Sequence, residues 1–227
     1  MTTQRLEGKR VLLTQADDYM GPATLPLFAE HGAEVIADTS NLTSQAAVEA
    51  LVERAGPIDI LIANLAAPAN TGIEATDLSD EDFATMFEVM VYPLHRLCRA
   101  ILPQMYARGS GKVVVYGSAT GLKAMARTSA YTAARTAQVG YVRATGLEAA
   151  RHNVQINLIA QNYVENPEYY PPELVSTERF QNHLQRNVPL GRLATAREDA
   201  LFALFLASQD SDFFVGQAIP FSGGWTQ

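Results

Sequence analysis

The stretch Tyr131–Arg135 (YTAAR) pairs a phenol with a guanidinium at a spacing that could support acid–base chemistry, because residues four positions apart lie on the same side of a helix. A phenol has a pKa of about 10 and acts as a base near neutrality only if its anion is stabilised. Arg135 could stabilise it, because a guanidinium stays charged in almost any environment. Ser118, about a dozen residues before Tyr131, is a third candidate. Taken singly, the three could also be a turn residue, a packed aromatic and a surface charge.

Alternating strand and helix patterns surround these candidates and predict parallel strands joined by crossover helices. The predicted strands are Arg10–Thr14, Glu34–Ala37, Ile58–Ile62, Lys112–Tyr116, Val154–Ile159 and Gln217–Phe221. The predicted helices are Pro22–His31, Ser44–Arg54, a long helix from Ser79 towards Met105, Ser129–Arg151 and Arg197–Ala207. Residues 161–190, rich in Pro and Tyr, are expected to form a lid or loop with short helices.

This order of elements predicts a Rossmann-like, doubly wound parallel sheet in a three-layer αβα arrangement. Only about twenty residues separate the second and third strand patterns, which leaves room for one helix, so we expect about six strands. Residues 1–227 show no internal repeat or linker and are expected to form a single catalytic domain. In such sheets the ligand site lies at the carboxyl ends of the strands, and Ser118 comes directly after one of them.

Composition limits the function classes. The 227 residues carry a formal net charge of −7, which argues against a nucleic-acid or anionic-membrane partner. Cys98, the single cysteine, lies in an apolar helical run and is expected to be packed. No signal peptide or membrane span is recognised, so a cytoplasmic protein is expected. The histidines, none of which we assign to a site, show no metal-ligand spacing; they are His31, His95, His152 and His183.

The order of a strand, Ser118, Tyr131, Arg135 and a strand containing Asn157 resembles the short-chain dehydrogenase/reductase family over essentially the whole chain. In that family a serine and the tyrosine hold the substrate oxygen. A lysine at the place of Arg135 binds the nicotinamide ribose. The family also has a Thr-Gly-x-x-x-Gly-x-Gly turn that approaches the cofactor pyrophosphate, and here this turn reads TQADDYMG over residues 14–21.

The motifs that face the cofactor in that family differ here. Gln15 and Tyr19 replace two glycines of the first turn, and Asp17 and Asp18 add negative charge where phosphates would lie. The other differences are Ala63-Asn64-Leu65-Ala66 for Asn-Asn-Ala-Gly, Met90 for a proton-relay asparagine, and Gln161-Asn162 for Pro-Gly. Asp38 alone stands where an acidic residue could hold the adenosine ribose, although a solvent-facing turn residue or helix cap is the commoner interpretation.

Thr14, Tyr19 and Gly21, together with the Ser–Tyr–Arg spacing, resemble the halohydrin dehalogenases, and the B-type enzymes in particular. The resemblance implies a carbon–halide lyase that needs neither cofactor nor metal. It would convert a vicinal haloalcohol to an epoxide, a halide and a proton, or open an epoxide with halide, azide, cyanide or nitrite. It also implies a homotetramer paired through the two long helices.

The resemblance assigns roles to residues of this chain. Tyr131 would be the base, Ser118 would hold the substrate oxygen, and Arg135 would stabilise the phenolate. The leaving halide would occupy the place of the nicotinamide, in a pocket formed by Tyr19, Gln161, Asn162, Tyr163 and Val164. Among the tyrosines of residues 161–190, Tyr163, Tyr169 and Tyr170 are expected to pack the lid rather than to catalyse.

Two other functions stay open from the sequence. An NAD(P)-dependent short-chain oxidoreductase with atypical cofactor binding is one, and Asp38 is its best support. A non-enzymatic Rossmann-fold binding module is the other. Retention of both Ser118 and Tyr131 argues against it.

Overall fold

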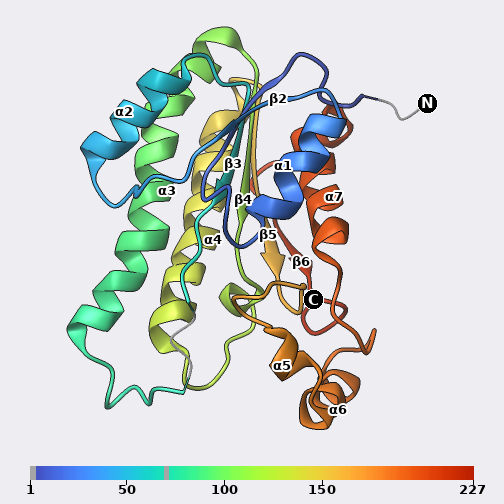
Figure 1. The fold of residues 1–227 in the computed structure, drawn as a ribbon. Helices are drawn as coiled ribbons and strands as arrows, with labels where there is room; N and C mark the ends of the chain where they lie inside the picture. Colours follow the sequence, from blue (N-terminus) through green and yellow to red (C-terminus); the bar gives the residue numbers. More distant parts are fainter. Residues whose placement is uncertain (1–3, 69–71) are drawn as a thin grey trace.

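The computed structural model describes residues 4–68 and 72–227, and in these ranges six parallel strands form one sheet in the order β2-β1-β3-β4-β5-β6 (Figure 1). The strands are β1 (Arg10–Leu13), β2 (Glu34–Ala37), β3 (Ile60–Asn64), β4 (Gly111–Tyr116), β5 (Val154–Gln161) and β6 (Ala218–Phe221). The predicted doubly wound sheet of about six strands is therefore confirmed.

Helices cover both faces of the sheet (Figure 1). One face carries α2 (Gln45–Ala55), α3 (Asp80–Arg108) and α4 (Ser129–Ala150), and the other carries α1 (Gly21–Glu30) and α7 (Ala196–Ala207). Each face has its own core of buried apolar side chains. Cys98 is fully buried in α3, as expected.

The long helix α3 shows how local sequence sets an element's bounds. Ser79 precedes it, and its hydroxyl accepts the N–H of Asp82 at 3.0 Å, which satisfies one of the free donors of the first turn. The helix continues to Arg108, three residues beyond the predicted end at Met105. It stops there because Gly109 adopts the left-handed conformation of a C-terminal cap.

Residues 162–190, between β5 and α7, lie over the carboxyl end of the sheet as a small layer of their own (Figure 1). It contains α5 (Pro172–Val175) and α6 (Glu178–Asn187), the short helices expected in this region. Phe180 and Leu184 of α6 form a separate apolar cluster with Tyr163, against which Trp225 packs. This cluster packs the layer against the C-terminal residues of the chain.

Register brings the site segments together. Tyr116 at the end of β4 pairs with Asn64 of β3 on one side and with Ile159 of β5 on the other. Ser118 follows Tyr116 by two residues and caps the 3-10 helix η1 (Ala119–Gly121). In the described ranges, none of the helices is both long and apolar enough to cross a bilayer.

Candidate active site

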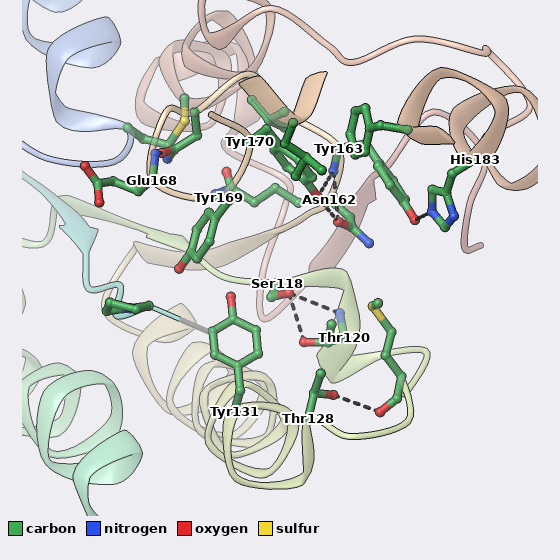
Figure 2. Close-up of a pocket in the computed structure, with 18 of the residues that line it drawn as sticks. Ser118, Thr120, Thr128, Tyr131, Asn162, Tyr163, Glu168, Tyr169, Tyr170 and His183 are labelled. Carbon is green, nitrogen blue, oxygen red and sulfur yellow. Dashed lines mark hydrogen bonds between the residues drawn. The ribbon is translucent and has the colours of Figure 1, made fainter. Parts of the chain in front are cut away.

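Ser118 and Tyr131 line one pocket of about 590 Å³ at the carboxyl end of the sheet, between the ends of β4 and β5 and the layer that holds α5 and α6 (Figure 2). Four of the residues predicted to hold a halide line the same pocket: Gln161, Asn162, Tyr163 and Val164. Arg135 lies behind Tyr131, with only 2% of its surface exposed. The structure thus groups residues that are far apart in the sequence.

The Ser118 hydroxyl is oriented by its neighbour Thr120. Its oxygen accepts a hydrogen bond from the Thr120 backbone N–H at 3.2 Å and another from the Thr120 hydroxyl at 2.9 Å. Both bonds use the oxygen as an acceptor. The hydroxyl proton of Ser118 therefore remains available to donate to a ligand in the pocket.

The Arg135 guanidinium is fixed by neutral acceptors. Its Nη1 donates to the carbonyls of Leu65 and Tyr116, each at 3.1 Å, and to Oε1 of Gln138 at 3.0 Å. Gln138 donates in turn to the carbonyl of Met90 at 2.9 Å, which ties α4 to α3. The position of the charge is therefore set by three separate segments.

Within residues 4–68 and 72–227, the ion pairs do not include Arg135, and its Nε has no hydrogen-bond partner. A buried charge without a counter-ion is unfavourable. The carbon of its guanidinium lies 5.1 Å from the ring centre of Tyr131. An ionised Tyr131 would therefore be the natural counter-ion of Arg135.

The pKa of Tyr131 reflects this arrangement. Burial, the largest influence, raises it, but the Arg135 charge and hydrogen bonding from Tyr169, Arg135 and Ser118 lower it, so that it ends below the ordinary value of a phenol. Arg135 shows the reciprocal effect. Burial lowers its pKa, but the coupling to Tyr131 and Tyr169 outweighs burial, and its pKa rises. The pair thus favours a phenolate beside a guanidinium.

Tyr169, which we expected only to pack the lid, is also a residue of the pocket. It lines the pocket, and its hydroxyl is directed towards that of Tyr131 (Figure 2). Its position depends on contacts with distant segments: its hydroxyl donates to the Ala67 carbonyl at 2.7 Å, and its ring contacts that of Tyr19 at 5.4 Å between centres. A residue pattern alone contains no signal for such contacts.

Asn162 presents amide N–H groups without an acceptor. Its Oδ1 accepts the backbone N–H of Tyr163 and the hydroxyl of Tyr170, each at 2.9 Å, while its Nδ2 is buried and has no partner in the part of the chain that the structure describes. Asn166 repeats this arrangement. Its Oδ1 accepts the N–H of Glu168 at 2.9 Å, and its buried Nδ2 is also unpaired among the described residues. Asn166 was missed in the sequence, although an asparagine before a proline is a turn signal that could have drawn attention to it.

Three predictions about the pocket need correction or refinement. Tyr19 does not line it but lies in an adjoining hollow, because Tyr169 packs against its ring and lines the pocket instead. Gln161 does line it, and its buried Oε1 has no hydrogen-bond partner among the residues that the structure describes. His183, which we assigned to no site, also lines the pocket and is bonded to the Tyr163 hydroxyl at 2.9 Å.

The adjoining hollow, of about 380 Å³, is bordered by the first turn (residues 14–21) and the loop after β3. Gln15 joins these two segments, because its amide accepts from the Ala66 N–H at 2.7 Å and donates to the Ala66 carbonyl at 3.0 Å. Gln15 and Tyr19 have φ of +45° and +50°, a conformation that favours glycine. The turn therefore has positive φ at the two positions where glycine is replaced, and carries two large side chains there.

The packing of the turn itself requires glycine at position 21, because a Cβ on Gly21 would lie 2.4 Å from the Ala16 carbonyl oxygen. Asp38 is a turn residue, as expected, since it accepts from Ser40 at 2.8 Å. It is not solvent-facing: it is 3% exposed and also pairs with Arg54 at 3.1 Å. Its carboxylate is thus already bound by its own neighbours.

Comparison with known proteins identifies the family. The family model described as enoyl-(acyl carrier protein) reductase matches residues 3–226. The oxidoreductase UcpA of Salmonella typhimurium is 30% identical, over 98% of this chain and 96% of its own. The 3-oxoacyl-(acyl-carrier-protein) reductase FabG of Thermotoga maritima is 28% identical, over 97% and 98%. The chain therefore belongs to the short-chain dehydrogenase/reductase family, and we describe it as an enzyme of that family.

Solved structures include similar proteins of two kinds. A dehalogenation enzyme is 31% identical, with a TM-score of 0.89 over 98% of this chain and 100% of its own. A gluconate 5-dehydrogenase from Burkholderia cenocepacia, solved with NADP and tartrate, is 26% identical, with a TM-score of 0.88 over 98% and 96%. Because both have nearly the same fold, the choice between these activities depends on the site.

The residues of the first turn do not fit a dinucleotide held on glycines. The Gln15 side chain bridges to Ala66, the Tyr19 ring stands where a glycine would leave space, and Asp17 and Asp18 border the hollow with negative charge. A pyrophosphate needs close approach to backbone N–H groups and is repelled by carboxylates.

Proposed function

We propose that this protein is a cofactor-independent halohydrin dehalogenase that converts vicinal haloalcohols to epoxides and catalyses the reverse opening of epoxides by small anions. The observation that carries the proposal is the buried, carboxylate-free Arg135 beside Tyr131. This pair supports proton abstraction, while the altered first turn leaves no cradle for a hydride donor. The similarity to a dehalogenation enzyme over the whole chain adds support.

The reaction begins with the haloalcohol hydroxyl between Ser118 and Tyr131. The Tyr131 phenolate takes the hydroxyl proton while Ser118 donates a hydrogen bond to the substrate oxygen. That oxygen attacks the neighbouring carbon from the side opposite the halogen. The new C–O bond closes the epoxide, and the C–halogen bond breaks with its electron pair on the halide. Arg135 stays charged throughout and does not exchange a proton.

The halide leaves towards the amide of Asn162. An anion removed from water needs donors, and Asn162 has unpaired N–H groups at the pocket wall. The unpaired amide of Asn166 provides a second donor in the same pocket. In reverse, azide, cyanide or nitrite would occupy this place and attack the epoxide. We also propose that the segment 161–190 covers the bound substrate as a lid.

A second candidate is an NAD(P)-dependent reductase, which the similarity to FabG and UcpA favours. The two proposals differ in their products. A dehalogenase releases bromide and epoxide in equal amounts from a vicinal bromoalcohol, whereas a reductase forms neither.

The experiment measures bromide and epoxide with the wild type and with Tyr131→Phe, which removes only the phenol oxygen. We expect equimolar products from the wild type and loss of nearly all activity in a folded variant. Bromide release by Tyr131→Phe close to the wild-type rate would exclude Tyr131 as the base.

A further inference from the structure

Tyr169 brings a third hydroxyl to the base from outside the helix that carries it. Tyr131 lies on α4 and Ser118 after β4, whereas Tyr169 belongs to the layer beyond β5. The hydroxyls of Tyr169 and Tyr131 are directed towards each other across the pocket (Figure 2). Tyr131 therefore has neighbours from three parts of the fold: the end of the sheet, its own helix and residues 161–190.

Contacts on several sides fix the Tyr169 ring. Its hydroxyl donates to the Ala67 carbonyl at 2.7 Å, its face contacts Tyr19, and its backbone N–H donates to the Asn166 carbonyl at 3.2 Å. Tyr19, its contact partner, has a left-handed backbone, with φ of +50°. Strained residues of this kind persist where the surroundings hold them, and they often accompany functional sites.

The hydrogen-bond count around Tyr169 depends on the state of Tyr131. A phenol hydroxyl has one proton. While Tyr131 is neutral, Tyr169 can accept from it and keep its own proton on the Ala67 carbonyl. Once Tyr131 is ionised, its oxygen is an acceptor only. Rotation of the Tyr169 proton from the Ala67 carbonyl to that oxygen then replaces a neutral bond by a stronger, charge-assisted one.

We propose that Tyr169 is a positioning residue for the catalytic base, a hydroxyl that turns from the Ala67 carbonyl to the Tyr131 oxygen when that oxygen is ionised. This inference rests on the proposed role of Tyr131 as the base. Ser118 and Arg135 face the same oxygen, and Tyr19 and Tyr170 act on it at longer range. The helix α3, which packs against α4, places the apolar side chains of Met86 and Met90 in the buried cluster that contains Tyr131.

Direct titration of tyrosinate absorbance tests the proposal without requiring enzyme activity. Tyr131 should ionise at lower pH than the other tyrosines whose pKa is shifted, because burial raises the pKa of all of those; they are Tyr19, Tyr106, Tyr116, Tyr141, Tyr163, Tyr169 and Tyr170. The step that disappears in Tyr131→Phe therefore belongs to Tyr131. The same titration is then made on Tyr169→Phe and on Tyr170→Phe.

In Tyr169→Phe we expect the Tyr131 step to move up by about 1 to 2 pH units, the shift that corresponds to one lost hydrogen bond to a charged group. Tyr170→Phe is the matched control. It removes the same atom from the adjacent residue, whose hydroxyl is bonded to Asn162, and should leave the step in place. The acid limb of the pH–rate profile for bromide release should move with the step in Tyr169→Phe.

The outcomes separate this inference from the function. A shifted step without bromide release in any variant would support the positioning role and refute the dehalogenase proposal. An unmoved step in Tyr169→Phe, or an equal shift in Tyr170→Phe, would overturn the positioning role. Loss of the Ala67 bond alone would lower the melting temperature and leave the step unchanged, so that result also overturns it.

Discussion

Arg135 is where this site differs most from that of a short-chain reductase. Three neutral acceptors hold the guanidinium under the Tyr131 ring. A lysine four residues after the tyrosine would have one point charge on a flexible stem, and an ammonium gives up its proton more readily when buried. If, as we propose, the site binds no nicotinamide ribose, the task of this position is to keep a charge near the Tyr131 oxygen, and arginine does that more dependably.

Arg135→Lys should keep part of the activity but shift its pH dependence. A weaker cation stabilises the phenolate less, so the pKa of Tyr131 rises and the acid limb of the pH–rate profile moves to higher pH. Halide release measured across pH reports the shift. Arg143→Lys, an exposed change on the same helix, is the control. Identical profiles for Arg135→Lys and wild type would show that Arg135 does not tune the base.

Asn162→Ala should weaken bromide product inhibition and azide opening of an epoxide together. The loss of a hydrogen bond to a charged group corresponds to an effect of about tenfold or more. Asn182→Ala on the exposed face of α6 serves as a control. If both quantities in Asn162→Ala remain within about twofold of wild type, the anion does not bind at Asn162.

The grouping of Ser118, Tyr131 and Arg135 could be predicted from residue spacing. Ser118 follows the end of a strand, and Tyr131 and Arg135 lie four residues apart on one face of a helix. Residue spacing could not predict Tyr169 or Asn166. Both residues lie in the irregular segment 161–190, where no periodicity indicates which side chains point inward. Their positions depend on hydrogen bonds to Ala67, for Tyr169, and to Glu168, for Asn166. His183 was missed for the same reason.

At the scale of elements, the first turn (residues 14–21) keeps the shape that the fold requires but is held by side chains of this chain. Asn64 at the end of β3 donates to the carbonyls of Gln15 and Asp18, at 2.9 and 3.0 Å, and so supports the turn from below. Gly21 permits the close approach to Ala16. The turn is thus stabilised by the protein's own side chains.

We therefore expect no measurable binding of NAD or NADP by the purified protein. The bridge from Gln15 to Ala66 and the ring of Tyr19 take up the space, and the carboxylates of Asp17 and Asp18 oppose a pyrophosphate. Titration calorimetry, with a nucleotide-binding reductase of the family as positive control, measures this directly. Micromolar affinity for either nucleotide would contradict the argument from the turn.

The elements themselves were largely predictable, and the deviations have local causes. The strand β3 begins at Ile60 rather than Ile58, because the Ile58 N–H is bonded to Gln104 and the Asp59 carboxylate accepts the Arg10 N–H. The strand β5 extends to Gln161, because it pairs with Phe221 of β6. Both deviations arise from pairing between segments, which single-segment patterns do not contain.

At the scale of the whole molecule, we expect Asp199 of α7 to couple pH to stability. It is fully buried, neither carboxylate oxygen has a hydrogen-bond partner within residues 4–68 and 72–227, and burial raises its pKa to about 8. The folded state therefore binds a proton that the unfolded chain releases near pH 4. The free energy of unfolding should fall as the pH rises from about 4 to about 8.

Asp199→Asn removes this titration and should flatten the pH dependence in that range. The difference between the two proteins should be on the order of a few kcal/mol at the alkaline end. Urea denaturation at several pH values measures it. Parallel curves for the two proteins would show that Asp199 is not protonated in the folded state.

We also propose that the protein forms a homotetramer through α3 and α4. These helices pack side by side and expose large apolar residues, Phe83 and Tyr92 on α3 and Leu147 on α4. Burial of such surface in a symmetric interface would stabilise the assembly. Light scattering should give four times the 24.7 kDa chain mass. The mass of a single chain would refute the assembly.

The central claim is that this site performs proton chemistry and not hydride transfer. Halide release from a vicinal bromoalcohol by nucleotide-free protein, measured with and without added NADPH, tests it most directly. NADPH oxidation in the presence of a ketone is followed in parallel. The account predicts the same bromide release with and without NADPH, and no oxidation of NADPH. Ketone-dependent NADPH oxidation without any bromide release would contradict it.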